Sequence, residues 1–290
     1  MGKTLKLQRS ETFYIREGWI EKILMSYRND SKGVFSKKMG SLNLGIGSNM
    51  VKSLKYWVDA CGLVIFNKDV IELTHIGSLI NTNDPYMETL FSWGLIHYQL
   101  AKNKENAPVF YAFFNHPSWK NISRKDSVQD FEDYFLDEGY SDINTQSLQK
   151  DIATLISSYY NDDNEDKTPE QNISCPLARL GLLTKKSRDC FEKKNIAIEN
   201  IDYRLLYICL KERYKDDFFN TEDAMTEEES PALVFNIDRD VFLTLILQMK
   251  KENLIDLNRT AGLNTVYFKS EKSDAELFAE YMAERNKRGV

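Results

Sequence analysis

The stretch LNLGIGSNMVKSLKYWVDACGLV, residues 42–64, decides the expected fold. Four of its apolar residues recur at helical spacing: Met50, Leu54, Trp57 and Cys61. Ser48 or Asn49 can cap the start of this helix, and Gly62 suits the position just after its end. The stretch therefore predicts an amphipathic helix that follows a glycine-rich turn and buries one face.

Helix and hairpin patterns flank this stretch on both sides. An apolar stripe with a spacing of four precedes it: Ile15, Trp19, Ile23 and Tyr27. Residues 63–66 and 70–73 are short apolar runs around a polar turn, which indicates a β-hairpin, and residues 74–77 open another short helix. Helix, tight turn, helix and hairpin is the order of a winged helix-turn-helix. Any small α+β domain with this order is the alternative.

The second half of the chain shows a similar order. A helix and a second hairpin are predicted over 238–268, and a charged terminal helix over 273–290. We expect a mainly α protein with a minor β part, built from winged helix-turn-helix-like modules with short β-hairpins and a helical second domain. The expected domains are a basic winged-helix-like DNA-binding domain with a helical extension at 1–160, an acidic linker at 161–172 and a helical, winged-helix-like domain at 173–290.

Charge is unevenly distributed along the 290 residues. The whole chain carries 38 Lys and Arg against 44 Asp and Glu, a net charge of -6, which by itself argues against nucleic acid. Residues 1–60, however, carry eleven basic and five acidic residues, a net of +6, whereas the remaining 230 residues have a net of -12. This asymmetry indicates one surface suited to a polyanion on an otherwise acidic protein. A chance fluctuation on a solvated surface is the alternative.

Several classes of protein are excluded by what the sequence lacks. The four cysteines include no CxxC pair, so they indicate neither a zinc half-site nor a disulfide framework. The first residues contain no apolar signal segment, and no run approaches the ~20 apolar residues of a membrane span. We therefore expect a cytoplasmic protein without membrane association.

The turn at 45–49, Gly-Ile-Gly-Ser-Asn, can bind a phosphate because backbone N–H groups are free at the start of a helix. It is not a Walker A loop, and it lacks the third glycine of a dinucleotide fingerprint, so we expect a DNA backbone phosphate there. The expected DNA-binding residues are Arg9, Arg16, Lys37, Lys38, Gly47, Ser48, Asn49, Lys52 and Lys55. A tight turn between two packed helices is the alternative for this glycine-rich segment.

Three residues are candidates for catalysis: Glu11, Asp84 and His97. Glu11 and Asp84 could act as a base or bind Mg²⁺ or another divalent cation, since hard cations prefer carboxylate oxygens. Each candidate also has a structural interpretation: a cap or an Arg16 partner for Glu11, a helix cap for Asp84, and a packed, hydrogen-bonded side chain for His97. No HxH, HxxxH, HExxH or GxSxG pattern occurs, so the metal ligands are unknown and nucleophilic hydrolase chemistry has little support.

A series of short elements carries a resemblance to a known family. In chain order they are R-S-E-T-F at 9–13, R-x-G-W at 16–19, L-G-I-G-S-N-M-V-K at 44–52, Trp57, L-T-x-x-G at 73–77, D-P-Y-x-E at 84–88, W-x-x-x-H at 93–97 and L-G-L-L at 180–183. Together they resemble the SspB-like family of bacterial DNA phosphorothioation operons, most closely over 1–115. The resemblance implies a DNA-nicking subunit that acts on double-stranded DNA beside a cysteine desulfurase, an ATPase and a sulfur-transferring enzyme.

Three functional hypotheses follow. The first is a DNA-binding protein of a phosphorothioate DNA-modification and anti-phage defence system, which nicks DNA as an endonuclease so that sulfur can be inserted into the backbone. The second is a non-catalytic winged-helix DNA-binding regulator or assembly subunit, favoured by the missing nuclease signature. The third places protein-docking surfaces on the acidic segments 162–172 and 216–230.

Overall fold

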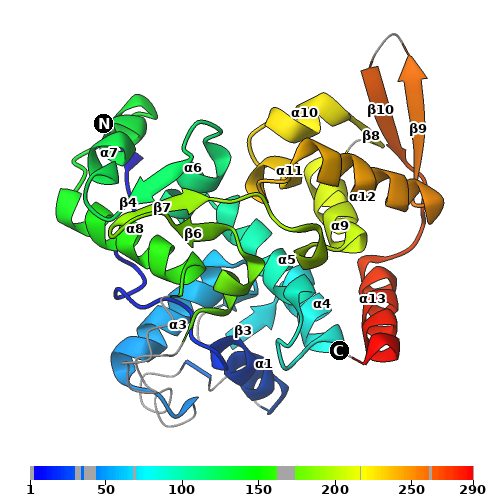
Figure 1. Cartoon of the computed structure of the whole chain (residues 1–290). Coiled ribbons are helices and arrows are strands. Elements are labelled where there is room, and N and C mark those ends of the chain that lie inside the picture. The colour runs from blue at the N-terminus through cyan, green and yellow to red at the C-terminus, as the bar shows by residue number, and fades with distance from the viewer. Residues whose placement is uncertain are drawn as a thin grey trace.

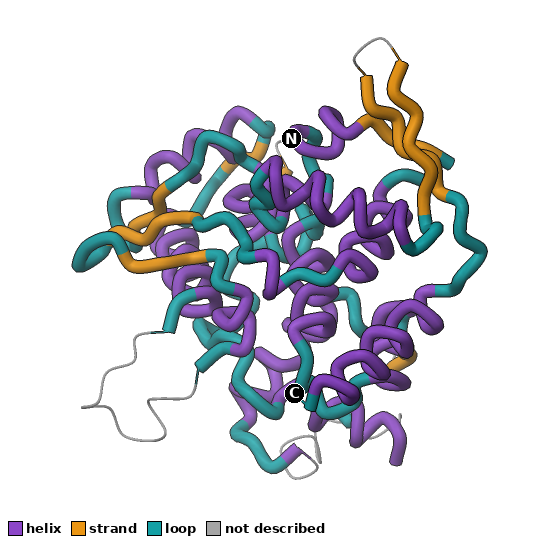
Figure 2. Tube along the Cα trace, turned by 45° about the vertical axis from the view of Figure 1, so that its right-hand side comes forward, coloured by secondary structure: helices purple, strands orange, loops and turns teal. Residues whose placement is uncertain are grey.

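A computed structural model shows a mainly helical protein with small peripheral sheets, as predicted (Figures 1 and 2). The structure describes residues 3–29, 34–35, 44–67, 70–161, 174–215, 217–260 and 263–289. Within these residues, no helix is long and apolar enough to cross a membrane.

The N-terminal module contains the predicted sequence of elements. Its helices are α1 (Trp19–Asn29), α3 (Ser48–Ala60) and α4 (His75–Asn83), and its hairpin pairs β2 (Val64–Asn67) with β3 (Val70–Leu73). Leu54 and Trp57 of α3 are completely buried, which confirms the expected apolar face. Gly77 allows α4 to lie against the hairpin, because a Cβ there would stand 2.0 Å from the carbonyl oxygen of Leu63. This close approach fixes the angle between the hairpin and α4.

A helical layer follows in the middle of the chain. It consists of α5 (Leu90–Ala101), α6 (Pro108–Asn115), α7 (Ser127–Asp137) and α8 (Thr145–Tyr159). Every residue of α5 after Leu90 is buried, so α5 is the centre of the core in Figure 1. The aromatic segment 107–115, which fits strand or helix by sequence, is the buried helix α6. Its eight residues have no solvent-facing side, so no periodicity marks them as helical.

Short strands link distant parts of the chain. Strand β1 (Lys3–Thr4) pairs in parallel with β5 (Tyr140–Ser141). Strand β7 (Cys190–Lys193) pairs with both β4 (Asn121–Ser123) and β6 (Leu183–Lys185). The β4–β7 pair joins residues from either side of the predicted linker, whose residues 162–172 lie outside the described part. The predicted division into two domains stays a prediction.

The C-terminal half contains a second module with the complete winged-helix topology. Its helices are α9 (Tyr203–Arg213), α10 (Thr221–Thr226), α11 (Pro231–Val234) and α12 (Arg239–Lys251), and its strands are β8 (Phe218–Asn220), β9 (Ile255–Thr260) and β10 (Leu263–Phe268). The sheet order β8-β10-β9 places the first strand beside the last, as in a winged helix. The predicted second hairpin is therefore confirmed.

One detail of this module differs from the sequence prediction. Residues 216–230 were expected as an acidic loop, but the described part of the segment contains β8 and α10. Phe219 drives this local order because it is buried and pairs with Val266 of β10, while the neighbouring acids point to solvent. The terminal helix α13 (Asp274–Arg288) is present as predicted and starts with a capping box formed by Ser273 and Glu276.

Candidate nucleic-acid interface

The start of α3 has the geometry of an anion-binding helix terminus. Gly45 adopts a φ of +63°, Gly47 is the N-cap residue, and no side chain caps the helix. The predicted cap at Ser48 or Asn49 is therefore wrong, since α3 already includes both residues. Ser48 and Asn49 are exposed beside it. The first N–H groups of a helix have no intrahelical acceptor and carry partial positive charge. The predicted phosphate position is therefore open to solvent.

Lys52 and Lys55 extend this positive start along the exposed side of α3. Both are exposed, and the ammonium of Lys55 lies 4.7 Å from the centre of the Phe66 ring. The ring orients Lys55 without neutralising its charge. The two lysines follow the open helix start by one and two turns, an arrangement that suits a row of phosphates.

Arg9 reaches the same helix from the N-terminal segment. Its Nη1 donates to Oδ1 of Asn106 at 2.6 Å, and its guanidinium lies 5.5 Å from the ring of Tyr56. Asp59 is 3.9 Å from its Nη2, so Arg9 lies on the side of α3 that also carries Lys52. We call Arg9, Gly47, Ser48, Asn49, Lys52 and Lys55 the α3 surface.

Glu11 projects from an unusual turn next to Arg9. Gln8, Glu11 and Thr12 all have positive φ angles, of 56°, 50° and 66°, although none is glycine. Such backbone persists where surrounding contacts enforce it, and it is enriched at functional sites. Gln8 is fixed because its N–H donates to Asp151 of α8 at 2.8 Å. The Glu11 carboxylate is exposed and has no ion pair or hydrogen bond with the described residues.

The remaining predicted cations lie elsewhere. Arg16 is partly buried, with its guanidinium near the rings of Phe13 and Trp19 at 5.5 and 5.9 Å. The Phe13 carbonyl accepts a hydrogen bond from Nε1 of Trp57, so this part of the segment is packed against α3. Lys37 and Lys38 lie outside the described residues. Arg16 is thus better placed to hold the segment than to contact a ligand.

Asp84 has the structural role that its position before a helix allowed. It is 2% exposed, and its carboxylate accepts hydrogen bonds from the N–H of Glu88, the N–H and hydroxyl of Thr89, and the hydroxyl of Ser92, at 2.6–3.0 Å. These four donors occupy the oxygens that a metal or a substrate would need. The geometry favours a structural role for Asp84 in the turn before α5 over a catalytic one. The predicted helix cap at Asp84 is wrong, because the N-cap of α5 is Thr89.

His97 is a core residue. Its Nε2 lies 3.1 Å from the carbonyl oxygen of Val234, which can only accept, so Nε2 carries the proton and Nδ1 accepts from the hydroxyl of Tyr159 at 2.7 Å. The ring is completely buried and makes edge contacts with Phe114 and Phe235. Burial lowers the pKa of His97 to about 3. A neutral, enclosed imidazole favours the packed interpretation of His97 over the catalytic one.

The lowered pKa of His97 predicts a stability that falls in acid. The imidazole takes up a proton near pH 6.5 in the unfolded chain and near 3 in the folded chain. Its contribution to the free energy of unfolding is therefore complete above about pH 6.5 and is lost as the pH falls. At pH 5 the loss is about 2 kcal/mol. Chemical denaturation at pH 7.5 and 5 should show the wild type losing about 2 kcal/mol more than His97→Gln. Equal losses would contradict the buried neutral state.

The described residues do not assemble the expected metal site. They contain no group of three or more His, Cys, Asp or Glu side chains that could hold a metal ion. Asp84 is enclosed by its donors, and Glu11 stands apart from it on the exposed turn. Glu11 and Asp84 therefore do not form a Mg²⁺ donor set, and we derive no chemical step through a metal.

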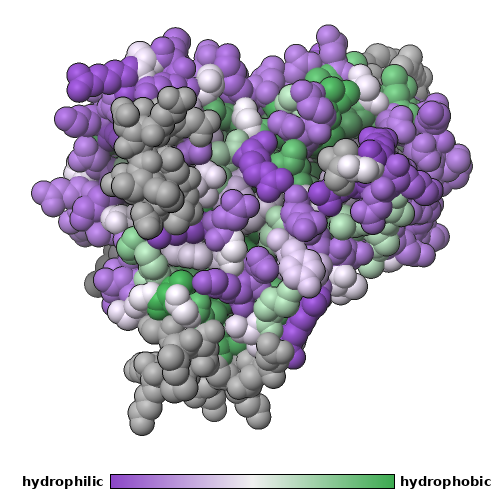
Figure 3. Space-filling view, turned by 60° about the horizontal axis from the view of Figure 1, so that its bottom comes forward, coloured by the Kyte–Doolittle hydropathy of each residue, from purple (hydrophilic) through white to green (hydrophobic). Residues whose placement is uncertain are grey.

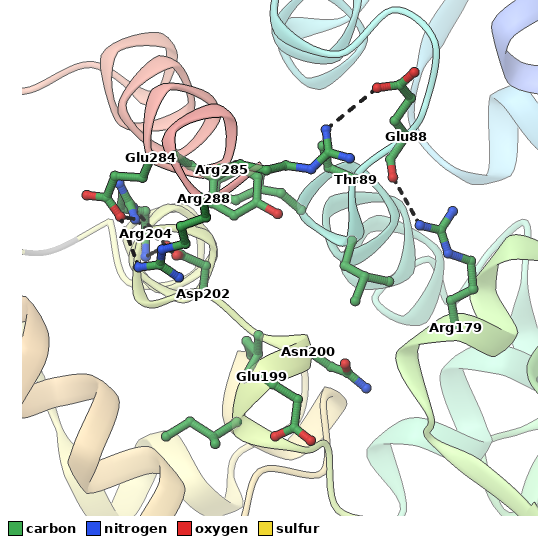
Figure 4. Close-up of a pocket in the computed structure, with 15 residues that line it drawn as sticks. Glu88, Thr89, Arg179, Glu199, Asn200, Asp202, Arg204, Glu284, Arg285 and Arg288 are labelled. Carbon is green, nitrogen blue, oxygen red and sulfur yellow. Dashed lines mark hydrogen bonds and ion pairs between the residues drawn. The ribbon is translucent and has the colours of Figure 1, made fainter. Parts of the chain in front are cut away.

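A separate cavity of about 400 Å³ lies where α5, α9 and α13 meet (Figure 4). The 3-10 helices η1 (Pro176–Leu180) and η2 (Ile198–Asn200) complete its wall. Its charged lining residues are four arginines and four acids: Arg179, Arg204, Arg285, Arg288, Glu88, Glu199, Asp202 and Glu284. The equal numbers of opposite charges distinguish this cavity from the α3 surface.

Most of the charged groups around the cavity bind one another. Arg204 bonds to Asp202 and Glu284, and Arg285 lies 3.6 Å from Glu88. Arg179 donates to the Glu88 carbonyl oxygen at 3.0 Å. These contacts fasten α13 to α9 and to the turn before α5. We interpret the cavity as a structural ion-pair network rather than as the main site for a polyanion.

Some contributors to the α3 surface were not identified from the sequence. Tyr56 and Asn106 hold Arg9, and Asp151 holds Gln8. Burial raises the pKa of Asp151 to about 7. Tyr56 was within reach of sequence analysis, because it follows Lys52 by four residues on the same helix. Asn106 and Asp151 carry no local signal, since their partners are 97 and 143 residues away.

The bottom of the molecule, which Figure 3 turns forward, is mostly hydrophilic outside the grey atoms. Its hydrophobic residues form small separate areas. With the open helix start and its lysines, this face suits a polar, anionic ligand better than an apolar partner. Fold and site together define a mainly helical protein with two winged-helix-like modules and a basic helix surface.

The chain belongs to the family described as "Protein of unknown function (DUF4007)", whose model matches residues 7–284. Its fold is similar to two solved structures, described as "SspB crystal structure" and "Magnesium ion-bound SspB crystal structure", with TM-scores of 0.79 and 0.78. Each is 20% identical in sequence, and each match covers 97% of this chain and 87% of the other. No curated protein matches the chain. The expected resemblance to SspB is confirmed at the level of the fold.

Proposed function

We propose that the protein binds double-stranded DNA through the α3 surface. One observation supports this most. The uncapped start of α3, its two exposed lysines and Arg9 of the N-terminal segment all lie at the same helix. Phosphate contacts of this type supply most of the affinity of a protein for DNA, and helix N-termini are frequent donors to the backbone. The mainly acidic remainder of the chain makes this local surface the preferred side for a polyanion.

The biological setting that we propose is phosphorothioate DNA modification and anti-phage defence in the cytoplasm. Support comes from the order of short motifs over residues 9–97 and from the similarity of the fold to SspB. In such a system the protein would act with a cysteine desulfurase, an ATPase and a sulfur-transferring subunit. Its contribution would be to hold the DNA on which those subunits work.

A nicking activity is the second part of this proposal. Nicking breaks one phosphodiester bond by adding water, and a carboxylate near the bound backbone can take the proton from that water. Glu11 is the candidate that the geometry favours, because it is exposed in a constrained turn beside Arg9, whereas Asp84 and His97 are buried and fully engaged. The alternative is a non-catalytic DNA-binding subunit, which binds DNA without nicking it.

Substitution of Glu11 tests the nicking proposal. Supercoiled plasmid incubated with the wild type, with and without Mg²⁺, should be converted to open circles. Glu11→Gln should slow this conversion by about 100-fold or more, because a general base typically contributes 10²–10⁴-fold, while DNA affinity stays within about twofold. Glu17→Gln, which changes another exposed carboxylate in the same region, is the matched control. DNA binding without open circles from the wild type would favour the non-catalytic subunit.

A further inference from the structure

An open groove of about 750 Å³ lies between the start of α7, the first half of α8 and the turn between β6 and β7. Four cations line it, with a single acid among the lining residues: Arg124, Lys125, Lys150, Arg188 and Asp189. Gln146 and Gln149 add amide groups from α8. The three segments are distant in the sequence, so this net positive groove exists only in the folded chain.

The lone acid of the groove is already engaged. Asp189 lies 3.4 Å from Nη1 of Arg124 and accepts from the hydroxyl of Ser123 at 3.3 Å. Arg124 itself is held 4.9 Å from the ring of Phe191 on β7. Lys125, Lys150 and Arg188 are exposed and have no acidic partner among the described residues. Their charges are therefore available to a ligand.

The shape of the groove favours a polymer over a small molecule. Small-molecule sites enclose most of their ligand among apolar groups, whereas this groove is open and cations make up four of its eight lining residues. A polyanion that releases counterions can bind such a surface without enclosure. The two glutamines suit phosphate and sugar oxygens as donors.

The helix α8 connects this groove with the α3 surface. Its Gln146, Gln149 and Lys150 line the groove, while Ser147 and Asp151 on its adjoining side bind Gln8. Arg9, the next residue, contacts Tyr56 of α3. In Figure 1, α8 lies between β6–β7 and α3. The groove and the α3 surface are thus connected through α8 and the N-terminal segment.

We propose that this groove binds the sugar-phosphate backbone of the same DNA duplex that contacts the α3 surface, which rests on the DNA binding proposed above. The α3 surface and the groove then hold separate phosphates on either side of the N-terminal segment. Glu11 is an exposed residue of that segment, two residues after Arg9. The groove sets how far the protein extends along the DNA.

The groove is tested with Lys125→Gln, Lys150→Gln and Arg188→Gln in one variant. DNA affinity is measured by fluorescence anisotropy between 0.05 and 0.3 M salt. Because each phosphate contact contributes about 0.9 to the slope of log affinity against log salt, the variant should lower the slope by about 2.7. Its hydroxyl-radical footprint on the duplex should also be shorter. The matched control neutralises three exposed lysines elsewhere, Lys211, Lys250 and Lys251, and should change neither result.

The outcomes separate this inference from the proposed function. An unchanged slope and footprint in the groove variant, with normal DNA binding by the wild type, would overturn the groove but leave DNA binding intact. Failure of the wild type itself to bind duplex DNA would instead overturn the proposed function. Circular dichroism of each variant shows that a lost contact is not a lost fold.

Discussion

Reversal of two charges, Lys52→Glu with Lys55→Glu, is expected to weaken DNA binding by about 60-fold at 0.1 M salt. Each phosphate contact contributes about 0.9 to the slope of log affinity against log salt. Between 1 M and 0.1 M salt, one contact therefore adds about 8-fold in affinity, and two contacts add about 60-fold. Both lysines are exposed on α3, so the change should leave the buried face, with Leu54 and Trp57, intact. The slope itself should fall by about 1.8.

The control for this prediction has the same change in net charge at another exposed helix end. Lys250→Glu with Lys251→Glu alters the last turn of α12, in the second winged-helix module. If binding depends on the location of charge, this variant should lose less than about threefold in affinity. Equal loss in both variants would show that net charge alone governs binding. Loss only in the α12 variant would move the DNA interface to the second module.

The α3 surface could be predicted from the sequence because its signals are local. The apolar spacing from Met50 to Cys61 defines one face of a helix, and Lys52 and Lys55 then fall on the other. The glycine-rich turn marks where the helix begins, and the structure starts α3 at Ser48. Periodicity and charge act within one or two turns, so the sequence contains these two signals. The capping prediction at Ser48 or Asn49 is wrong, because Gly47 is the N-cap residue and no side chain caps α3.

The features that sequence analysis missed depend on contacts between distant segments. A histidine in a helix gives no sign that a tyrosine 62 residues later and a carbonyl 137 residues later will satisfy its ring. Asp84 was expected to cap the next helix, but the N-cap of α5 is Thr89. The Asp84 carboxylate instead accepts from donors four to eight residues later, which no local pattern predicts. The groove at Arg124 and Arg188 required the pairing of β4 with β7, which no local pattern predicts.

Removal of Arg204 is expected to cause the largest loss of stability among single substitutions at charged residues described above. Arg204 is 2% exposed, binds both oxygens of Asp202 at 2.9 and 3.1 Å, and donates to Glu284 at 2.8 Å. Its guanidinium also lies 4.7 Å from the Tyr203 ring. These hydrogen bonds tie α9 to α13 and lower the pKa of Glu284. Arg204→Met leaves the two carboxylates without their partner.

The expected cost is about 3 kcal/mol, the lower end for a broken buried ion pair, because Asp202 and Glu284 keep partial access to water. The melting temperature should fall by roughly 6–10 °C. Arg288→Ala is the control. Its side chain is 76% exposed and lies 3.8 Å from Glu284, so its removal should cost less than about 0.5 kcal/mol. Equal stability of the two variants would contradict the role of Arg204.

A triple variant distinguishes a lost attraction from a stranded charge. Arg204→Met combined with Asp202→Asn and Glu284→Gln removes all three charges, while Asn can still cap α9 where Asp202 accepts the N–H of Arg204. If the penalty comes from unpaired carboxylates, the triple variant should regain about 2 of the 3 kcal/mol. If it stays as unstable as Arg204→Met alone, the cost lies instead in the packing of the arginine between Tyr203 and Tyr281. In both cases the free energy of unfolding, measured by chemical denaturation, reports how α13 is held to α9.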